Sequence, residues 1–86
     1  MMGAVDIANI IQLLDAILGD RTVPKNIRKV IEDSKSALVS SEKSEELKMS
    51  TAIHLLDEVT NDPNMPLYTR TQIWNAVSML EQLRRE

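Results

Sequence analysis

The sequence contains no cysteine and no phenylalanine, and it has only two glycines, three prolines, one tryptophan and one tyrosine. Without cysteine the chain can form neither a disulfide bond nor a thiolate metal site, which fits a cytoplasmic protein. The scarcity of glycine and proline argues against disorder and against many tight turns. The apolar residues, 43% of the chain, are almost wholly aliphatic, because phenylalanine is absent and tryptophan and tyrosine occur once each. This composition suits interlocking helices better than strands, which draw more on aromatic side chains.

An excess of positive charge and a long apolar run are also missing. The net charge is −3, so nucleic-acid binding is not the default expectation. No apolar stretch approaches the roughly 18 residues that a membrane span requires. Asp6 and Asp15 interrupt the apolar N-terminal stretch, and no basic segment precedes it, so we expect no secretory signal. These features predict a soluble, cytoplasmic protein without a membrane segment.

Apolar residues recur at helical spacing in four segments. We expect helices near residues 4–18, 23–39, 44–60 and 66–84. The third segment places Met49, Ala52, Ile53, Leu56 and Val59 on one face. The stripe of the last segment is Ile73, Ala76, Met79, Leu80 and Leu83. The pattern predicts an all-α protein.

The boundaries of these helices carry their own signals. Gly19 follows the first segment, where a left-handed residue commonly ends a helix. Pro24 falls near the start of the second, and either Ser41 or Ser44 can cap the third. The turn signal Asn61-Asp62-Pro63-Asn64 separates the third segment from the fourth.

An internal repeat relates the two halves of the chain. With an offset of 42 residues, Ile11–Leu38 aligns with Ile53–Leu80 without a gap, and ten of the 28 pairs are identical. The identical pairs include Leu14 with Leu56, which we expect to be equivalent core residues, and Pro24 with Pro66. Chance would give only a few identities at this composition, so the sequence indicates a duplicated helical hairpin.

Two hairpins that each carry an apolar stripe must cover one another. We therefore predict one domain over residues 1–86, a four-helix bundle of two tandem antiparallel hairpins at about residues 4–39 and 44–84. The outline of the repeat is also similar to a HEAT-type unit. Two units fall short of the roughly three that a solenoid needs, so the closed bundle is favoured.

Two segments of the chain resemble the hallmarks of a known family. They are Asp20-Arg21-Thr22-Val23-Pro24-Lys25-Asn26-Ile27-Arg28 and Asn61-Asp62-Pro63-Asn64-Met65-Pro66, and the run Arg70-Thr71-Gln72-Ile73-Trp74 extends the likeness. The chain is similar over nearly its whole length to a short archaeal family catalogued only as uncharacterised. The resemblance implies a helical bundle in an archaeal cytoplasm, and it implies no activity, cofactor or site residue.

His54 is the one histidine, with Asp57 and Glu58 three and four residues further on. The three side chains could share a helix face and bind a metal or move protons. No second histidine and no cysteine completes a ligand set, and the aligned residue in the other hairpin is Gln12. We therefore expect an exposed polar histidine, no metal and no cofactor.

Acidic and basic residues recur in both hairpins, notably Asp20 with Asp62 and Arg28 with Arg70. They could bind a ligand as Asp–Arg pairs. A structural role is favoured because a constraint of the fold acts on both copies, whereas a catalytic site needs only one. We expect the aspartates to cap turns and the arginines to bond to a carboxylate or to helix-end carbonyls.

Four basic residues surround the predicted start of the second helix: Arg21, Lys25, Arg28 and Lys29. Positive charge beside free helix N-terminal amides can bind phosphate. Only Arg28 has a basic counterpart in the second hairpin, and no glycine-rich loop or stacking aromatic residue accompanies the cluster. Contact with nucleic acid is therefore the alternative, and solvated charge is the simpler interpretation.

Trp74 lies off the predicted apolar stripe of the last helix. Leu67 falls beside it on the helix, Val77 lies between this pair and the stripe, and Arg70 is one turn away. The residues aligned with Leu67, Trp74 and Val77 in the first hairpin are all charged: Lys25, Glu32 and Lys35. This clustered change from charged to apolar residues predicts a contact surface made of Leu67, Arg70, Trp74 and Val77.

These observations favour a small, non-enzymatic helical module that acts through protein–protein contact, most simply as a homo-oligomer. The sequence shows no nucleophile–base pair, metal set or phosphate loop. The alternative is an accessory factor that contacts RNA or the translation machinery through the basic cluster.

Overall fold

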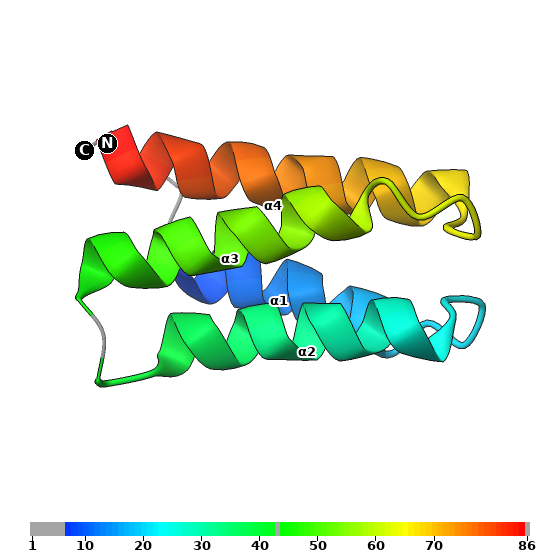
Figure 1. Cartoon of the computed structure of the whole chain (residues 1–86), viewed down its shortest axis with the longest axis horizontal. Coiled ribbons are helices and arrows are strands. Elements are labelled where there is room, and N and C mark those ends of the chain that lie inside the picture. The colour runs from blue at the N-terminus through cyan, green and yellow to red at the C-terminus, as the bar shows by residue number, and fades with distance from the viewer. Residues whose placement is uncertain (1–6, 43, 86) are drawn as a thin grey trace.

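Four helices make up the part of the chain that this computed structural model describes, residues 7–42 and 44–85 (Figure 1). They are α1 (Ile7–Leu18), α2 (Lys25–Val39), α3 (Glu45–Val59) and α4 (Leu67–Arg85). No strand occurs in the described ranges, so the all-α prediction is confirmed. The expected start of the first helix, at residue 4, lies outside the described residues. None of the described helices is long and apolar enough to cross a membrane.

The helices form a closed ring in which each helix packs against two others. Within the described residues the contacting pairs are α1 with α2, α2 with α3, α3 with α4, and α4 with α1. The α2–α3 contact is the most extensive of these. The α1–α2 and α3–α4 turns lie at the same end of the ring, and the α2–α3 loop lies at the other (Figure 1). This is the predicted four-helix arrangement.

Aliphatic side chains from all four helices fill the centre of the ring. Leu14 and Leu56, predicted as equivalent core residues, are both fully buried. Every residue of the stripe expected for α3 is buried as well: Met49, Ala52, Ile53, Leu56 and Val59. The amphipathic pattern therefore identified the buried face of this helix correctly.

The two hairpin turns have the same backbone hydrogen bonds at an offset of 42 residues. Asp20 N donates to Ile17 O and Val23 N donates to Asp20 O; Asp62 N donates to Val59 O and Met65 N donates to Asp62 O. A carboxylate closes each turn, because Thr22 N donates to Asp20 Oδ1 at 2.9 Å and Asn64 N donates to Asp62 Oδ1 at 2.8 Å. These matching bonds are what a duplicated hairpin predicts, and the duplication itself stays a prediction.

The turn signal at residues 61–64 lies between α3 and α4 as expected. Of the other three boundary signals, two are confirmed and one is wrong. Ser44 caps α3, because its side chain accepts a hydrogen bond from Leu47 N at 3.2 Å. Pro24 occupies the N-cap position of α2, close to its expected place. Gly19, however, is not left-handed. Its N–H donates to Asp15 O and the next N–H donates to Ile17 O, so α1 ends in a tightened right-handed turn that does not require glycine.

Candidate interaction site

Three large apolar or aromatic side chains lie exposed within the first eight residues of α4. Leu67 is 75% exposed, Tyr68 is 69% exposed and Trp74 is 54% exposed. Leu67 and Trp74 are seven residues apart, so they project from the same side of the helix, while Tyr68 lies next to Leu67 in the chain. We call these three residues the α4 surface. The exposure that the sequence predicted for Leu67 and Trp74 is confirmed.

Val77 does not belong to this surface. It is 8% exposed and lies in the hydrophobic core, so its placement in a contact surface was wrong. The predicted stripe relied on Met79 and Leu83, which are only partly buried, and it left out Thr69, which is fully buried. Without Met79 and Leu83, the buried face of α4 turns toward Val77. Trp74 then lies on the flank of the helix, about 100° from Ile73, which accounts for its partial exposure.

Arg70 is half-buried beside the α4 surface and has a structural role. Its Nη2 donates a hydrogen bond of 3.1 Å to the backbone carbonyl of Asp62. The guanidinium thus ties the first turn of α4 to the loop before it, as the structural interpretation of the repeated arginines expected. Arg70 is therefore a support for the exposed side chains around it.

The four residues of the basic cluster do not act as four free cations. Lys29 donates to Asp33 Oδ1 at 2.9 Å, and this hydrogen bond, together with the Asp33 charge, raises the pKa of Lys29. Arg28 is half-buried, and its Nε is enclosed without a partner in the described structure. Arg21 and Lys25 are exposed. Two exposed cations make a weaker phosphate site than the sequence suggested.

His54 is exposed, as expected. Its Nε2 lies 3.7 Å from Glu58 Oε2, and the two side chains are 77% and 73% exposed. No group of three or more His, Asp or Glu side chains that could hold a metal occurs among the described residues.

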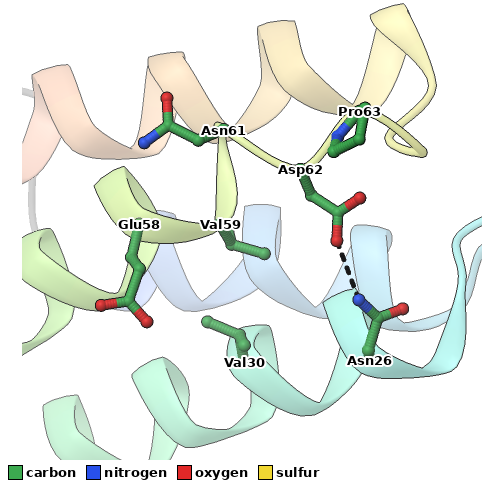
Figure 2. A pocket seen from close by; sticks show the side chains of 7 residues that line it. All are labelled: Asn26, Val30, Glu58, Val59, Asn61, Asp62 and Pro63. Atoms are coloured by element: carbon green, nitrogen blue, oxygen red, sulfur yellow. Dashed lines mark hydrogen bonds between the residues drawn. The ribbon is translucent and has the colours of Figure 1, made fainter.

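A shallow pocket of about 380 Å³ lies between the first half of α2 and the end of α3 (Figure 2). Its lining residues are Asn26, Val30, Glu58, Val59, Asn61, Asp62 and Pro63. Asn26 Nδ2 donates to Asp62 Oδ2 across the pocket at 2.8 Å, which joins the first hairpin to the second. Figure 2 shows the Glu58 carboxylate on the opposite side of the two valines from this hydrogen bond.

The sequence predicted neither the pocket nor the exposure of Tyr68. The residue aligned with Tyr68 is Asn26, so the polar-to-aromatic change that drew attention to Trp74 also occurs at Tyr68 and could have identified it. The pocket had no such signal, because its lining combines residues that are up to 37 positions apart, from Asn26 to Pro63. Only the packing of α2 against α3 brings them together.

The sequence matches, over residues 3–83, the model of a family described as Uncharacterised protein family (UPF0147). A UPF0147 protein of Methanocaldococcus jannaschii is 51% identical over 72 residues, which cover 84% of this chain and 77% of that protein. A UPF0147 protein of Thermoplasma volcanium is 43% identical over 76 residues, which cover 88% of this chain and 85% of that protein. The predicted likeness to an uncharacterised archaeal family is confirmed.

Two crystal structures share the fold. A protein of unknown function superposes with a TM-score of 0.86 at 42% identity, covering 93% of this chain and 96% of its own. A protein from the same family in Thermoplasma acidophilum superposes with a TM-score of 0.84 at 43% identity, covering 88% of this chain and 89% of its own. The descriptions of these relatives name no ligand, partner or reaction.

Proposed function

The chain belongs to the uncharacterised protein family UPF0147, and we propose that it is a small, non-enzymatic interaction module that binds protein through the α4 surface. The simplest partner is a second copy of the chain, which would make the protein a homo-oligomer. A cytoplasmic location, expected from the cysteine-free composition, is part of the same proposal.

The observation that carries this proposal is the exposure of Leu67, Tyr68 and Trp74 on one helix. Isolated exposed apolar residues are ordinary on a protein surface, but Leu67 and Trp74 share one side of α4, and tryptophan is enriched at the centres of interfaces. Of the three, Leu67 and Trp74 align with the charged residues Lys25 and Glu32 of the other hairpin. Because Leu67 and Trp74 are exposed, packing within the monomer does not require a leucine or a tryptophan there.

The substitution Trp74→Glu tests the proposal. It introduces the residue type found at Glu32 into a half-exposed site, so we expect circular dichroism to show an unchanged helix content. A charge in the centre of an apolar interface is desolvated without a partner, which typically costs several kcal/mol. Light scattering should therefore show that the variant is monomeric where the unaltered protein is oligomeric.

Leu47→Glu is the matched control. Leu47 is 51% exposed and lies in the first turn of α3, at the opposite end of the molecule from the start of α4 (Figure 1). This variant should keep the oligomer intact. The proposal of self-association fails if the unaltered protein is a monomer at high concentration, or if Leu47→Glu dissociates the oligomer as Trp74→Glu does.

The alternative, contact with RNA through the basic cluster, has less support. The pairing of Lys29 with Asp33 and the partial burial of Arg28 leave Arg21 and Lys25 as its exposed cations outside an ion pair among the described residues. A protein that neutralises RNA phosphates loses affinity steeply as salt rises. Salt-dependent binding of a homopolymeric RNA that is abolished by Arg21→Ala with Lys25→Ala would reverse this preference.

A further inference from the structure

We infer that the pocket between α2 and α3 receives a lysine or arginine side chain of a partner protein. The inference concerns a surface separate from the α4 surface, because none of the lining residues belongs to α4. The basis for this ligand is that the pocket combines an apolar floor with an acidic rim.

The floor of the pocket suits an aliphatic chain. Val30 and Val59 project into it from α2 and α3 (Figure 2). Val59 is 6% exposed and belongs to the core, so it is held in place, while Val30 is partly buried against the same core. Lysine and arginine can lay their methylene stems along such apolar surface while the charged head stays in contact with water.

The rim of the pocket carries negative charge that its own residues do not neutralise. The two oxygens of Asp62 accept hydrogen bonds from Asn26 Nδ2 and Asn64 N, and both donors are uncharged. Glu58 lies 3.7 Å from His54 Nε2, a contact that is ionic only when the histidine is protonated. No lysine or arginine lines the pocket.

A described cation, Arg70, contacts the backbone of Asp62 and not its carboxylate. Arg70 Nη2 donates to the backbone carbonyl of Asp62 at 3.1 Å, whereas no ion pair joins Arg70 to the Asp62 carboxylate among the described residues. Arg70 therefore does not neutralise the Asp62 carboxylate, and its negative charge remains available at the pocket. Glu58 lies across the valines from Asp62, so a side chain whose stem covers Val30 and Val59 can place its head group at Glu58, while Asp62 adds negative charge at the other edge.

An NMR titration of the full chain tests the inference. The probes are the peptides acetyl-Gly-Lys-Gly-amide and acetyl-Gly-Arg-Gly-amide, with the norleucine peptide as an uncharged match. We expect at least one basic peptide to shift the side-chain amide signals of Asn26 and Asn61, and we expect norleucine to leave them in place. Adding salt should weaken the binding, because Glu58 is exposed and Asp62 is partly exposed.

Two variants, each of which removes one negative charge, provide the matched comparison. Glu58→Gln removes an acid of the rim, and Asp57→Asn removes the neighbouring exposed acid of α3, which does not line the pocket. An exposed ion pair contributes up to about 1 kcal/mol, so Glu58→Gln should weaken the peptide about three- to fivefold. Asp57→Asn should change its affinity less than twofold.

Three results would overturn the inference: equal shifts with the norleucine peptide, equal losses in the two variants, or shifts with spermidine but with neither basic peptide. The last result would make the ligand a free polyamine. Because Trp74 lies outside the pocket, Trp74→Glu should leave the peptide titration unchanged. A monomeric protein that binds the basic peptide would therefore refute self-association and still support the pocket.

Discussion

At the scale of single residues, Gly19 is a position where the structure differs from the conformation expected from the sequence. Residues other than glycine fit poorly at a position with a left-handed backbone. Gly19 is right-handed, and a Cβ added to it would meet Asp15 O at 3.6 Å, an ordinary contact. We therefore expect Gly19→Ala to stabilise the fold by about 0.4–1 kcal/mol, because alanine reduces the freedom of the unfolded chain. Urea unfolding measures the difference.

The reverse change at a neighbouring exposed position is the control for Gly19→Ala. Ala16 lies inside α1 and is exposed, so Ala16→Gly should cost roughly 0.5–1 kcal/mol. If Gly19→Ala instead destabilises the protein, the end of α1 needs a conformation that only glycine adopts.

Asp20 makes the stability of the first turn depend on pH. Hydrogen bonds from the Thr22 hydroxyl and from Thr22 N lower the pKa of Asp20. Because the folded-state pKa is the lower one, the contribution is complete above the unfolded-state pKa and is lost as the pH falls through the folded-state value. Urea unfolding at several acidic pH values should show this loss.

Two variants isolate the contribution of Asp20. Asp20→Asn should remove its share of the acid-dependent loss, and Thr22→Ala should raise the pKa of Asp20 toward its ordinary value in an NMR titration. A pKa that does not move in Thr22→Ala would show that the hydroxyl bond, 2.7 Å long, contributes nothing in solution.

At the scale of helices and turns, the hydrogen bond between Asn26 and Asp62 links the two hairpins. Asp62 also closes its own turn, so the single variant Asp62→Ala loses more than the link. A double-mutant cycle with Asn26→Ala isolates the pair. We expect a coupling of about 0.5–1.5 kcal/mol, measured by urea unfolding, and a value near zero would show that the bond does not stabilise the packing of α2 against the second turn.

The sequence predicted helices better than it predicted the surfaces between them. The stripe of α3 was right at every position because its members recur at helical spacing on one face, and the apolar Leu47, which lies off that face, is exposed. In α4 the partly buried Met79 and Leu83 were counted in the stripe, which displaced the predicted face and put Val77 outside. The pocket was missed because it depends on which residues of α2 meet the end of α3, and helical periodicity does not give that register.

At the scale of the whole molecule, the ring predicts that neither hairpin folds alone. Each hairpin contacts the other along two sides, α2 with α3 and α1 with α4, so isolation would expose its apolar stripe. We expect fragments 1–43 and 44–86 to show little helix by circular dichroism when separate, and to regain helix when mixed. A fragment that is fully helical alone would show that the hairpins are independent units.

The unequal contacts around the ring also have a consequence for slow motion. The α2–α3 contact is the most extensive, and α1 is the shortest helix described. Local opening follows the weakest contacts, so backbone amides of α1 should exchange with deuterium sooner than those in the centres of α2 and α3. While α1 is detached, the side of α4 that it covers is uncovered too. The protein then briefly presents a second apolar face on the helix that already carries Leu67 and Trp74.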